Sequence, residues 1–109
     1  MAIPKYYEFF PPIMEVLSDG KIHHFNEVRN YCVKYYSLAG EEQQEMLPSG
    51  KKSYVNDRVS WAKTYLKKAG LLSSPTRSNY QITELGKDYT IVDNIQGIGR
   101  YVGTYIGLS

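Results

Sequence analysis

The stretch from Val55 to Gly70 constrains the fold more than any other part of the chain. Apolar residues recur there at spacings of 4, 3, 4 and 3, which predicts a helix with a single apolar stripe. Gly70 follows the basic pair Lys67-Lys68, as expected of a C-terminal cap behind charges that suit the negative helix end. The stripe consists of Val55, Val59, Ala62, Leu66 and Ala69.

A hairpin is predicted directly after this helix. Leu71-Leu72-Ser73 has the pattern of a strand, residues 74–79 form a polar turn, and Tyr80-Gln81-Ile82 alternates as the returning strand. Thr83 is a suitable N-cap for a further short helix that ends near Tyr89. A helix with a basic surface followed by a two-stranded hairpin is the arrangement of a winged helix-turn-helix.

The first half of the chain supplies the other helices of such a fold. Pro11-Pro12 indicates that the first helix is either kinked there or begins there. We therefore expect a mainly α (α+β) domain, a winged helix-turn-helix with a small two- to three-stranded wing hairpin. Its upstream elements are a helix over about 6–18, a short strand at 21–23, a helix over about 25–36 and a short acidic helix over 40–47.

Length and composition exclude several classes of protein. The 109 residues suffice for one ordinary domain but not for a barrel enzyme or a two-domain nucleotide enzyme. The single cysteine, Cys32, rules out an internal disulfide and a cysteine metal cluster. Apolar runs are too short to span a membrane, and the N-terminus lacks a signal peptide. We expect a cytoplasmic protein.

Charge is unevenly distributed along the chain. Residues 51–80 hold seven basic residues and one acid, Asp57, whereas the rest of the chain has a net negative charge. A local basic field suggests an anionic partner at one face, although a merely solvated charged face has the same composition.

Several motifs together resemble the N-terminal domain of Mrr-type modification-dependent restriction proteins, over about residues 3–89. The most specific is the run from Asn56 to Leu72, with Leu17–Lys21, Leu47–Lys51 and Ile82–Gly86 in the matching order. The resemblance implies a winged-helix fold, DNA as the ligand, and a usual position in front of a nuclease domain. Family members often carry Arg-Gly at the wing tip, where this chain has Arg77-Ser78.

Double-stranded DNA, possibly methylated, is therefore the expected partner. On the face opposite the apolar stripe, small polar side chains are suited to base edges and lysines to phosphates. Trp61 and Tyr65 could stack on bases, but packing in the core is the favoured interpretation for Trp61. The candidate DNA-binding residues are Lys51, Lys52, Ser53, Asn56, Ser60, Lys63, Thr64, Lys67, Arg77 and Asn79.

No catalytic, metal or cofactor site is expected. Asp19-Gly20-Lys21 is the only acid-x-Lys tripeptide, and after a helix Asp-Gly is typical of a turn. His23-His24 lacks further ligands at metal-binding spacing and is interpreted as a strand end and helix start. Cys32 lies on an apolar stripe and is expected to be a packed thiol.

We accordingly expect residues 1–90 to form a DNA-binding domain of a restriction system, with the nuclease domain absent from this chain. Residues 91–109 are expected to be a helical extension or a linker, because Ile91, Ile95, Ile98 and Val102 recur at helical spacing. Such a helix could pair with a second copy in a homodimer. The alternatives are a stand-alone winged-helix transcriptional regulator, which should dimerise, and a protein–protein adaptor.

Overall fold

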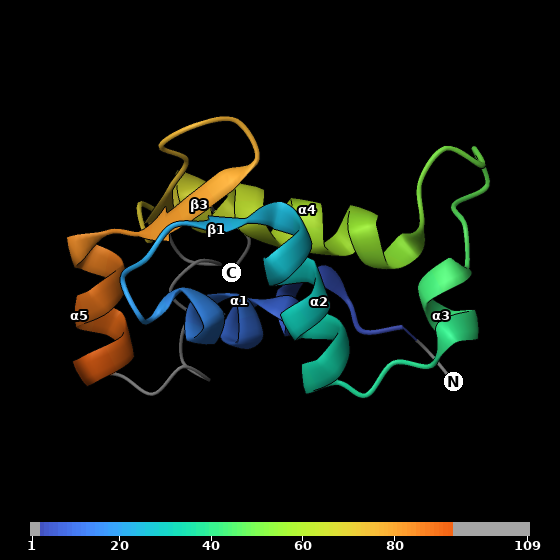
Figure 1. The fold of residues 1–109 in the computed structure, drawn as a ribbon, viewed down its shortest axis with the longest axis horizontal. Helices are drawn as coiled ribbons and strands as arrows, with labels where there is room; N and C mark the ends of the chain where they lie inside the picture. Colours follow the sequence, from blue (N-terminus) through green and yellow to red (C-terminus); the bar gives the residue numbers. More distant parts are fainter. Residues whose placement is uncertain (1–2, 93–109) are drawn as a thin grey trace.

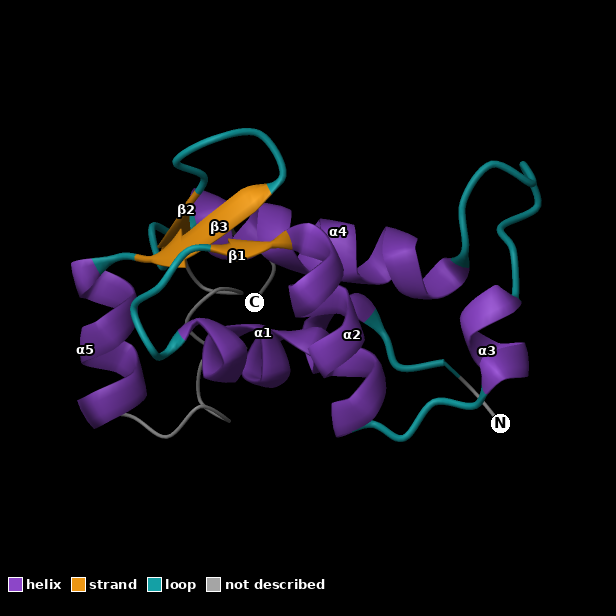
Figure 2. Cartoon of the chain, in the orientation of Figure 1, coloured by secondary structure: helices purple, strands orange, loops and turns teal. Residues whose placement is uncertain are grey.

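The computed structural model describes residues 3–92 (Figures 1 and 2). Helices predominate and accompany a three-stranded antiparallel sheet of order β1-β3-β2, consistent with a winged-helix α+β fold. The fold class expected from the sequence is confirmed. The elements are η1 (Tyr6–Phe9), α1 (Phe10–Leu17), β1 (His23–His24), α2 (Phe25–Tyr35), α3 (Gly40–Gln44), α4 (Tyr54–Lys68), β2 (Leu72–Ser73), β3 (Asn79–Ile82) and α5 (Glu84–Val92).

The two prolines near the N-terminus mark the start of an α-helix rather than a kink inside one. Residues Tyr6–Phe9 form a 3-10 turn, and α1 begins at Phe10, which leaves Pro11 and Pro12 in its first turn. Backbone N–H groups in that turn have no partner within the helix, so a proline there loses no hydrogen bond. The single helix predicted over 6–18 is therefore divided in two.

The sheet joins the first half of the chain to the wing. Strand β3 pairs with β2 through Leu72 and Ile82, and with β1 through His23 and Tyr80. The first strand is His23–His24, which corrects the predicted 21–23: it begins two residues later and ends one residue later. In Figure 2 the loop between β2 and β3 rises above the sheet at the top of the view.

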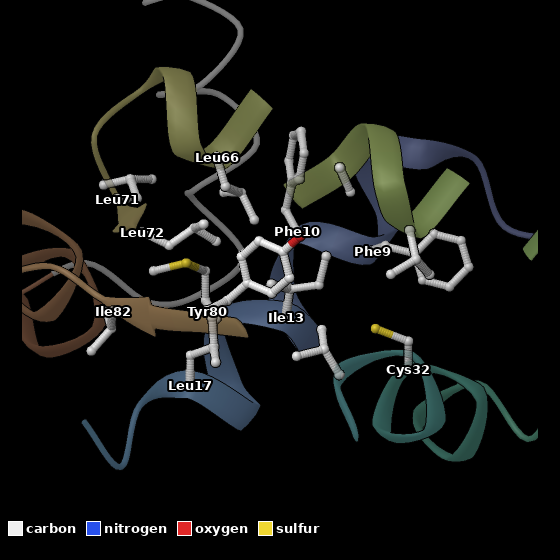
Figure 3. Close-up of a cluster of buried hydrophobic side chains, with 14 of the residues drawn as sticks. Phe9, Phe10, Ile13, Leu17, Cys32, Leu66, Leu71, Leu72, Tyr80 and Ile82 are labelled. Carbon is white, nitrogen blue, oxygen red and sulfur yellow. The ribbon is translucent and has the colours of Figure 1, made fainter. Parts of the chain in front are cut away.

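The core lies between α4, α1 and the sheet (Figure 3). All five residues of the predicted stripe on α4 are buried, so that prediction is confirmed. Helix α1 contributes Phe10, Ile13 and Leu17, and the sheet contributes Leu72, Tyr80 and Ile82. The spacing of Phe25, Val28, Cys32 and Tyr35 predicts one apolar stripe on α2, but Tyr35 is 40% exposed. Because α2 ends at Tyr35, the next ring, Tyr36, turns in and packs edge-on against Phe9 at 5.8 Å.

Both ends of α4 are capped as local chemistry dictates. The Ser53 hydroxyl accepts a hydrogen bond from the backbone N–H of Asn56 at 3.1 Å. Gly70, with φ of +80°, takes the left-handed conformation that ends a helix, as predicted. Thr83 accepts from the backbone N–H of Gly86, which confirms it as the cap of α5; that helix extends to Val92, beyond the predicted end near Tyr89.

Helix α5 approaches the sheet through Gly86. A Cβ atom at this position would lie 2.1 Å from the carbonyl oxygen of Leu71 and 2.7 Å from Cγ1 of Ile82. Only a glycine permits this close approach of α5, which lies at the left end of the molecule in Figure 1.

The acidic helix α3 is shorter than predicted and lies at the opposite end of the molecule from α5 (Figure 1). Met46, expected inside this helix, instead forms a β-bridge with Ser53. The backbone after Gln44 is therefore extended and leads into the basic loop before α4.

The predicted extension over 91–109 lies, beyond Val92, outside the described residues. Across residues 3–92, none of the helices combines the length and apolar character needed to cross a membrane.

Candidate nucleic-acid interface

A shallow groove of about 330 Å³ lies where the start of α2, the first half of α4 and the wing meet. It brings together segments that are far apart in the sequence. None of its lining residues is acidic, and two are lysines. The lining residues are His24, Phe25, Asn26, Lys52, Asn56, Ser60, Lys63, Ser78 and Tyr80.

Four residues predicted from the sequence line this groove together: Lys52, Asn56, Ser60 and Lys63. The three on α4 follow one another at spacings of four and three, which places them on one face of the helix. Lys67 is exposed one turn further along the same face. The predicted helix face therefore forms one wall of a concave surface.

Other predicted residues lie outside the groove lining. Lys51 is exposed in the loop before α4. The Thr64 hydroxyl donates to the carbonyl of Ser60 within the helix, at 2.9 Å. Ser53 is only 8% exposed, and its hydroxyl caps α4, so the structure gives this side chain a role within the fold.

The three wing residues Arg77, Ser78 and Asn79 differ in exposure and in their contacts. The side chain of Arg77 is exposed at the tip of the loop. Ser78 lines the groove and has a φ of +64°, the left-handed region in which family members with Arg-Gly would place a glycine. The Asn79 side-chain amide donates to the Thr76 hydroxyl at 2.9 Å and to the Arg77 carbonyl at 3.1 Å. Asn79 therefore shapes the turn that presents Arg77.

The positive charge of the groove is held in place by contacts with neighbouring side chains. The ammonium of Lys63 lies 5.2 Å from the centre of the Tyr80 ring, a cation–π distance that leaves its charge unneutralised. Lys52 Nζ lies 3.8 Å from a carboxylate oxygen of Asp57. Asp57 itself is in the first turn of α4, where negative charge is favourable.

His24 and Asn26 belong to the groove but were not among the predicted site residues. His24 Nδ1 accepts a hydrogen bond from the backbone N–H of Asn26 at 3.0 Å, so it caps α2. With Nδ1 as acceptor, the ring proton is on Nε2, which can donate to a ligand. Their place in the groove depends on the pairing of β1 with β3. No local pattern in the sequence indicates this pairing, so the sequence could not predict them.

Trp61 corrects a prediction. Its side chain is 50% exposed rather than packed in the core, and its ring stacks on Tyr65 with centroids 5.9 Å apart. Tyr65 in turn contacts Tyr6 of η1 at 5.1 Å. On α4 these rings lie on the other side of the buried stripe from Asn56 and Ser60, and neither ring lines the groove.

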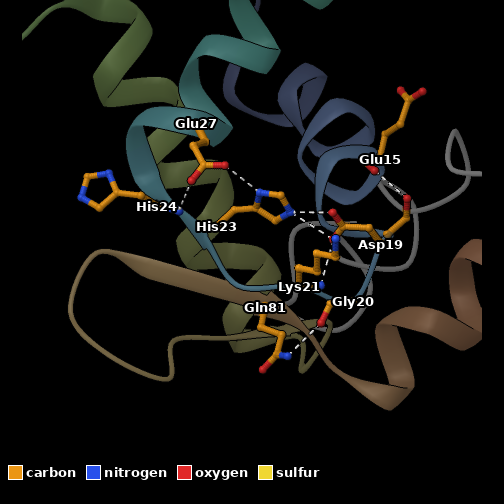
Figure 4. A network of polar contacts seen from close by, with 9 residues as sticks. Glu15, Asp19, Gly20, Lys21, His23, His24, Glu27 and Gln81 are labelled. Carbon is orange, nitrogen blue, oxygen red and sulfur yellow. Dashed lines mark hydrogen bonds and ion pairs between the residues drawn. The ribbon is translucent and has the colours of Figure 1, made fainter.

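His23 does not line the groove and lies between two carboxylates (Figure 4). Its Nε2 is 2.9 Å from Asp19, and its Nδ1 is 2.9 Å from Glu27. The hydrogen bonds to Glu27 and Asp19 raise the pKa of His23, the one to Glu27 most. The pKa of Glu27 is lowered mainly by His23, and the pKa of Asp19 is lowered mainly by the Lys21 backbone N–H and then by His23. Figure 4 also shows that His24, the next residue, points away from this cluster.

The His23 cluster ties the fold together and is not arranged for metal binding. Asp19 and Glu27 contact different ring nitrogens, so the three side chains do not converge on one point. Within residues 3–92 no group of three or more His, Cys, Asp or Glu side chains is placed to hold a metal ion. The Asp19-Gly20-Lys21 segment is a turn, in which the Lys21 backbone N–H donates to Asp19 at 2.8 Å.

Cys32 is a packed thiol, as predicted. Its side chain is fully buried in the core, and this burial raises its pKa to about 12. A thiol with that pKa is almost entirely protonated at neutral pH and is a poor nucleophile.

Comparison with known proteins gives a family match. A family model described as the Mrr N-terminal domain matches residues 6–91, nearly the same span as the motifs found in the sequence. No curated protein and no solved structure matches the chain.

Proposed function

Because the chain belongs to the Mrr N-terminal domain family, which associates it with Mrr-type restriction proteins, we propose that it is the double-stranded DNA-binding module of a modification-dependent restriction system. The observation that carries the proposal is the groove. It gathers two lysines and several short polar side chains from α2, α4 and the wing, with no acid among its lining residues.

Helix α4 has the dimensions of a recognition helix. Its 15 residues extend over about 22 Å, and a helix fits the major groove of B-DNA, which is about 12 Å wide. Asn56 and Ser60 are short enough to reach base edges once the helix is inserted. The wing then lies beside the duplex backbone, with Arg77 at its tip.

The basic residues are assigned to phosphates. Lys51 and Lys52 precede α4, Lys63 and Lys67 follow one another on its exposed face, and Arg77 is on the wing. Phosphate contacts fix the register of a protein on the duplex but carry no sequence information. The His24 ring is a further donor along the same surface, whereas the Thr64 hydroxyl donates its proton within α4 and can only accept from a ligand.

Binding, without chemistry, is the function assigned to this chain. In the proposed system the duplex is cut by a separate nuclease domain, and the present domain selects the site in the cytoplasm. A homodimer through residues 91–109 is compatible with this role.

A protein–protein adaptor is the second candidate, and one observation favours it. Trp61 is 50% exposed and stacks on Tyr65 of α4, and Tyr7 is 47% exposed and contacts the ring of Tyr6. Exposed aromatic rings are typical of protein interfaces. An adaptor would not require the lysines of the groove.

The test is equilibrium binding of a short duplex at several salt concentrations. If about four phosphates are neutralised, the slope of log K against log salt should be near −3 to −4. Lys52→Ala together with Lys63→Ala should reduce the slope by about two units, since each phosphate contact contributes about one.

Lys34→Ala is the matched control, because Lys34 is an exposed lysine near the other end of α2 and does not line the groove. It should leave both the affinity and the slope unchanged. Absence of duplex binding even at about 50 mM salt would refute the proposal and favour the adaptor.

A further inference from the structure

The side chain of Asn56, a groove residue, is held by a hydrogen bond from another helix. Its Oδ1 accepts a hydrogen bond from Nε of Arg29, at 2.5 Å, across 27 positions of sequence. A second bond, from Arg29 to Oδ1 of Asn30 at 3.1 Å, holds the guanidinium in place. Arg29 is half-buried on α2, so this contact joins two helices at the edge of the groove.

The chemistry of arginine decides which way the amide is turned. A guanidinium has donors only, so the atom of Asn56 that faces Arg29 has to be the carbonyl oxygen. Arg29 does not line the groove, whereas Asn56 does. The oxygen is therefore turned toward α2, and the Nδ2 group, with its two N–H donors, is the part left for a ligand.

This orientation restricts which base edge the residue can recognise. A bidentate contact between asparagine and adenine uses the oxygen to accept from N6 and the nitrogen to donate to N7. With the oxygen held by Arg29, that pairing is disfavoured. Guanine presents two acceptors, N7 and O6, in the major groove and needs only donors from the protein.

We propose that Arg29 is a positioning residue that turns the Asn56 amide so that the groove selects a guanine edge over an adenine edge. This inference rests on the proposed DNA-binding function and names the base chemistry read at one position. Arg29 acts through Asn56 and is not itself a base contact.

The experiment is selection of bound duplexes from a randomised pool by the whole chain, followed by titration of defined duplexes. We expect one position at which guanine is preferred over adenine by about tenfold, the discrimination typical of a good base contact. Replacing that guanine by 7-deazaguanine, which lacks the N7 acceptor, should weaken binding severalfold.

Two variants separate positioning from general stability. Asn56→Asp keeps the acceptor for Arg29 but removes both donors, and carboxylates accept from the N4 amino group of cytosine. The preferred base at that position should therefore change from guanine to cytosine. Arg29→Met frees the amide, so the ratio of guanine to adenine affinity should fall to about threefold or less.

Arg29→Lys is the conservative variant, because lysine can donate to the same oxygen, and it should restore part of the guanine preference. Thermal melting of each variant shows that the domain is folded. A wild-type protein that binds DNA without a guanine preference overturns this inference alone, as does an Arg29→Met protein with an unchanged ratio. A wild-type protein that binds no duplex overturns the proposed function.

Discussion

Gly86→Ala is expected to destabilise the domain, although the same change in an exposed helix would stabilise it. The added Cβ would lie 2.1 Å from the Leu71 carbonyl oxygen and 3.1 Å from its carbonyl carbon. These are backbone atoms and cannot swing aside as a flexible side chain would. Helix α5 would have to move by about 1.4 Å to restore an ordinary contact of about 3.5 Å.

Two opposing terms give the size of the effect. Overpacking by a methyl group costs about 1–3 kcal/mol, and the upper end applies because backbone has to move. Replacing glycine by alanine within a helix returns about 1 kcal/mol. The net expected loss is about 2 kcal/mol, or a melting temperature lower by roughly 10 °C for a domain of this size.

Urea denaturation followed by circular dichroism measures this loss, with Gly40→Ala as the matched control. Gly40 is also helical, but no atom lies within 4 Å of the position its Cβ would take. The control should therefore be neutral or slightly stabilising. A Gly86→Ala protein as stable as the control would refute the packing described for α5.

Three further outcomes are expected. Trp61→Ala should cost about 1–2 kcal/mol because the ring is half exposed, whereas Leu66→Ala should cost about 2–5 kcal/mol at a fully buried site; equal losses in urea denaturation would contradict the placement of Trp61. Because the pKa of His23 is raised in the folded state, its contribution is fully present below about pH 6.5 and is lost as pH rises through the folded pKa. His23→Gln should therefore destabilise the protein at pH 6 but little at pH 9, and a constant difference between wild type and variant across this range would refute the ion-pair cluster. Ser78→Gly should raise the free energy of unfolding by up to about 1 kcal/mol, since glycine adopts positive φ without steric cost; a lower thermal midpoint would count against the left-handed wing tip.

The parts of the fold that were predictable are those that local patterns encode. The stripe on α4, the capping Gly70 and the cap at Thr83 each depend on a few neighbouring residues, and all three are confirmed. The hairpin was predictable for the same reason, since its strands flank a polar turn. A family match over residues 6–91 agrees with the motifs quoted from the sequence.

The errors occurred where side chains are placed by tertiary contacts. An aromatic residue at helical spacing suggested a buried Trp61, but the neighbouring rings of Tyr65 and Tyr6 cover only part of it. Ser53 is not such an error, because its predicted DNA contact stays a prediction; what the structure adds is that its hydroxyl caps α4. For Trp61, a buried ring and a half-exposed ring have the same spacing along a helix, so the local pattern could not distinguish them.

The sequence predicted the site residues that lie on α4, but not those that α2 and β1 contribute. Asn56, Ser60 and Lys63 follow from the spacing on α4 alone. His24, Asn26 and the contact from Arg29 depend on how α2 and β1 pack against α4 and β3, which is long-range information.

The most direct test of the central claim is to map the DNA-bound surface residue by residue. Titration of a short duplex into ¹⁵N-labelled protein should shift the backbone amides of the groove, from His24 to Asn26, along α4 from Asn56 to Lys67, and at Arg77 and Ser78. The amides near the C-terminal end of α2, around Lys34, lie outside the groove and should not move. Shifts confined to the surface around Trp61 and Tyr7, or absent at about 50 mM salt, would contradict the assignment of the groove as a DNA-binding site.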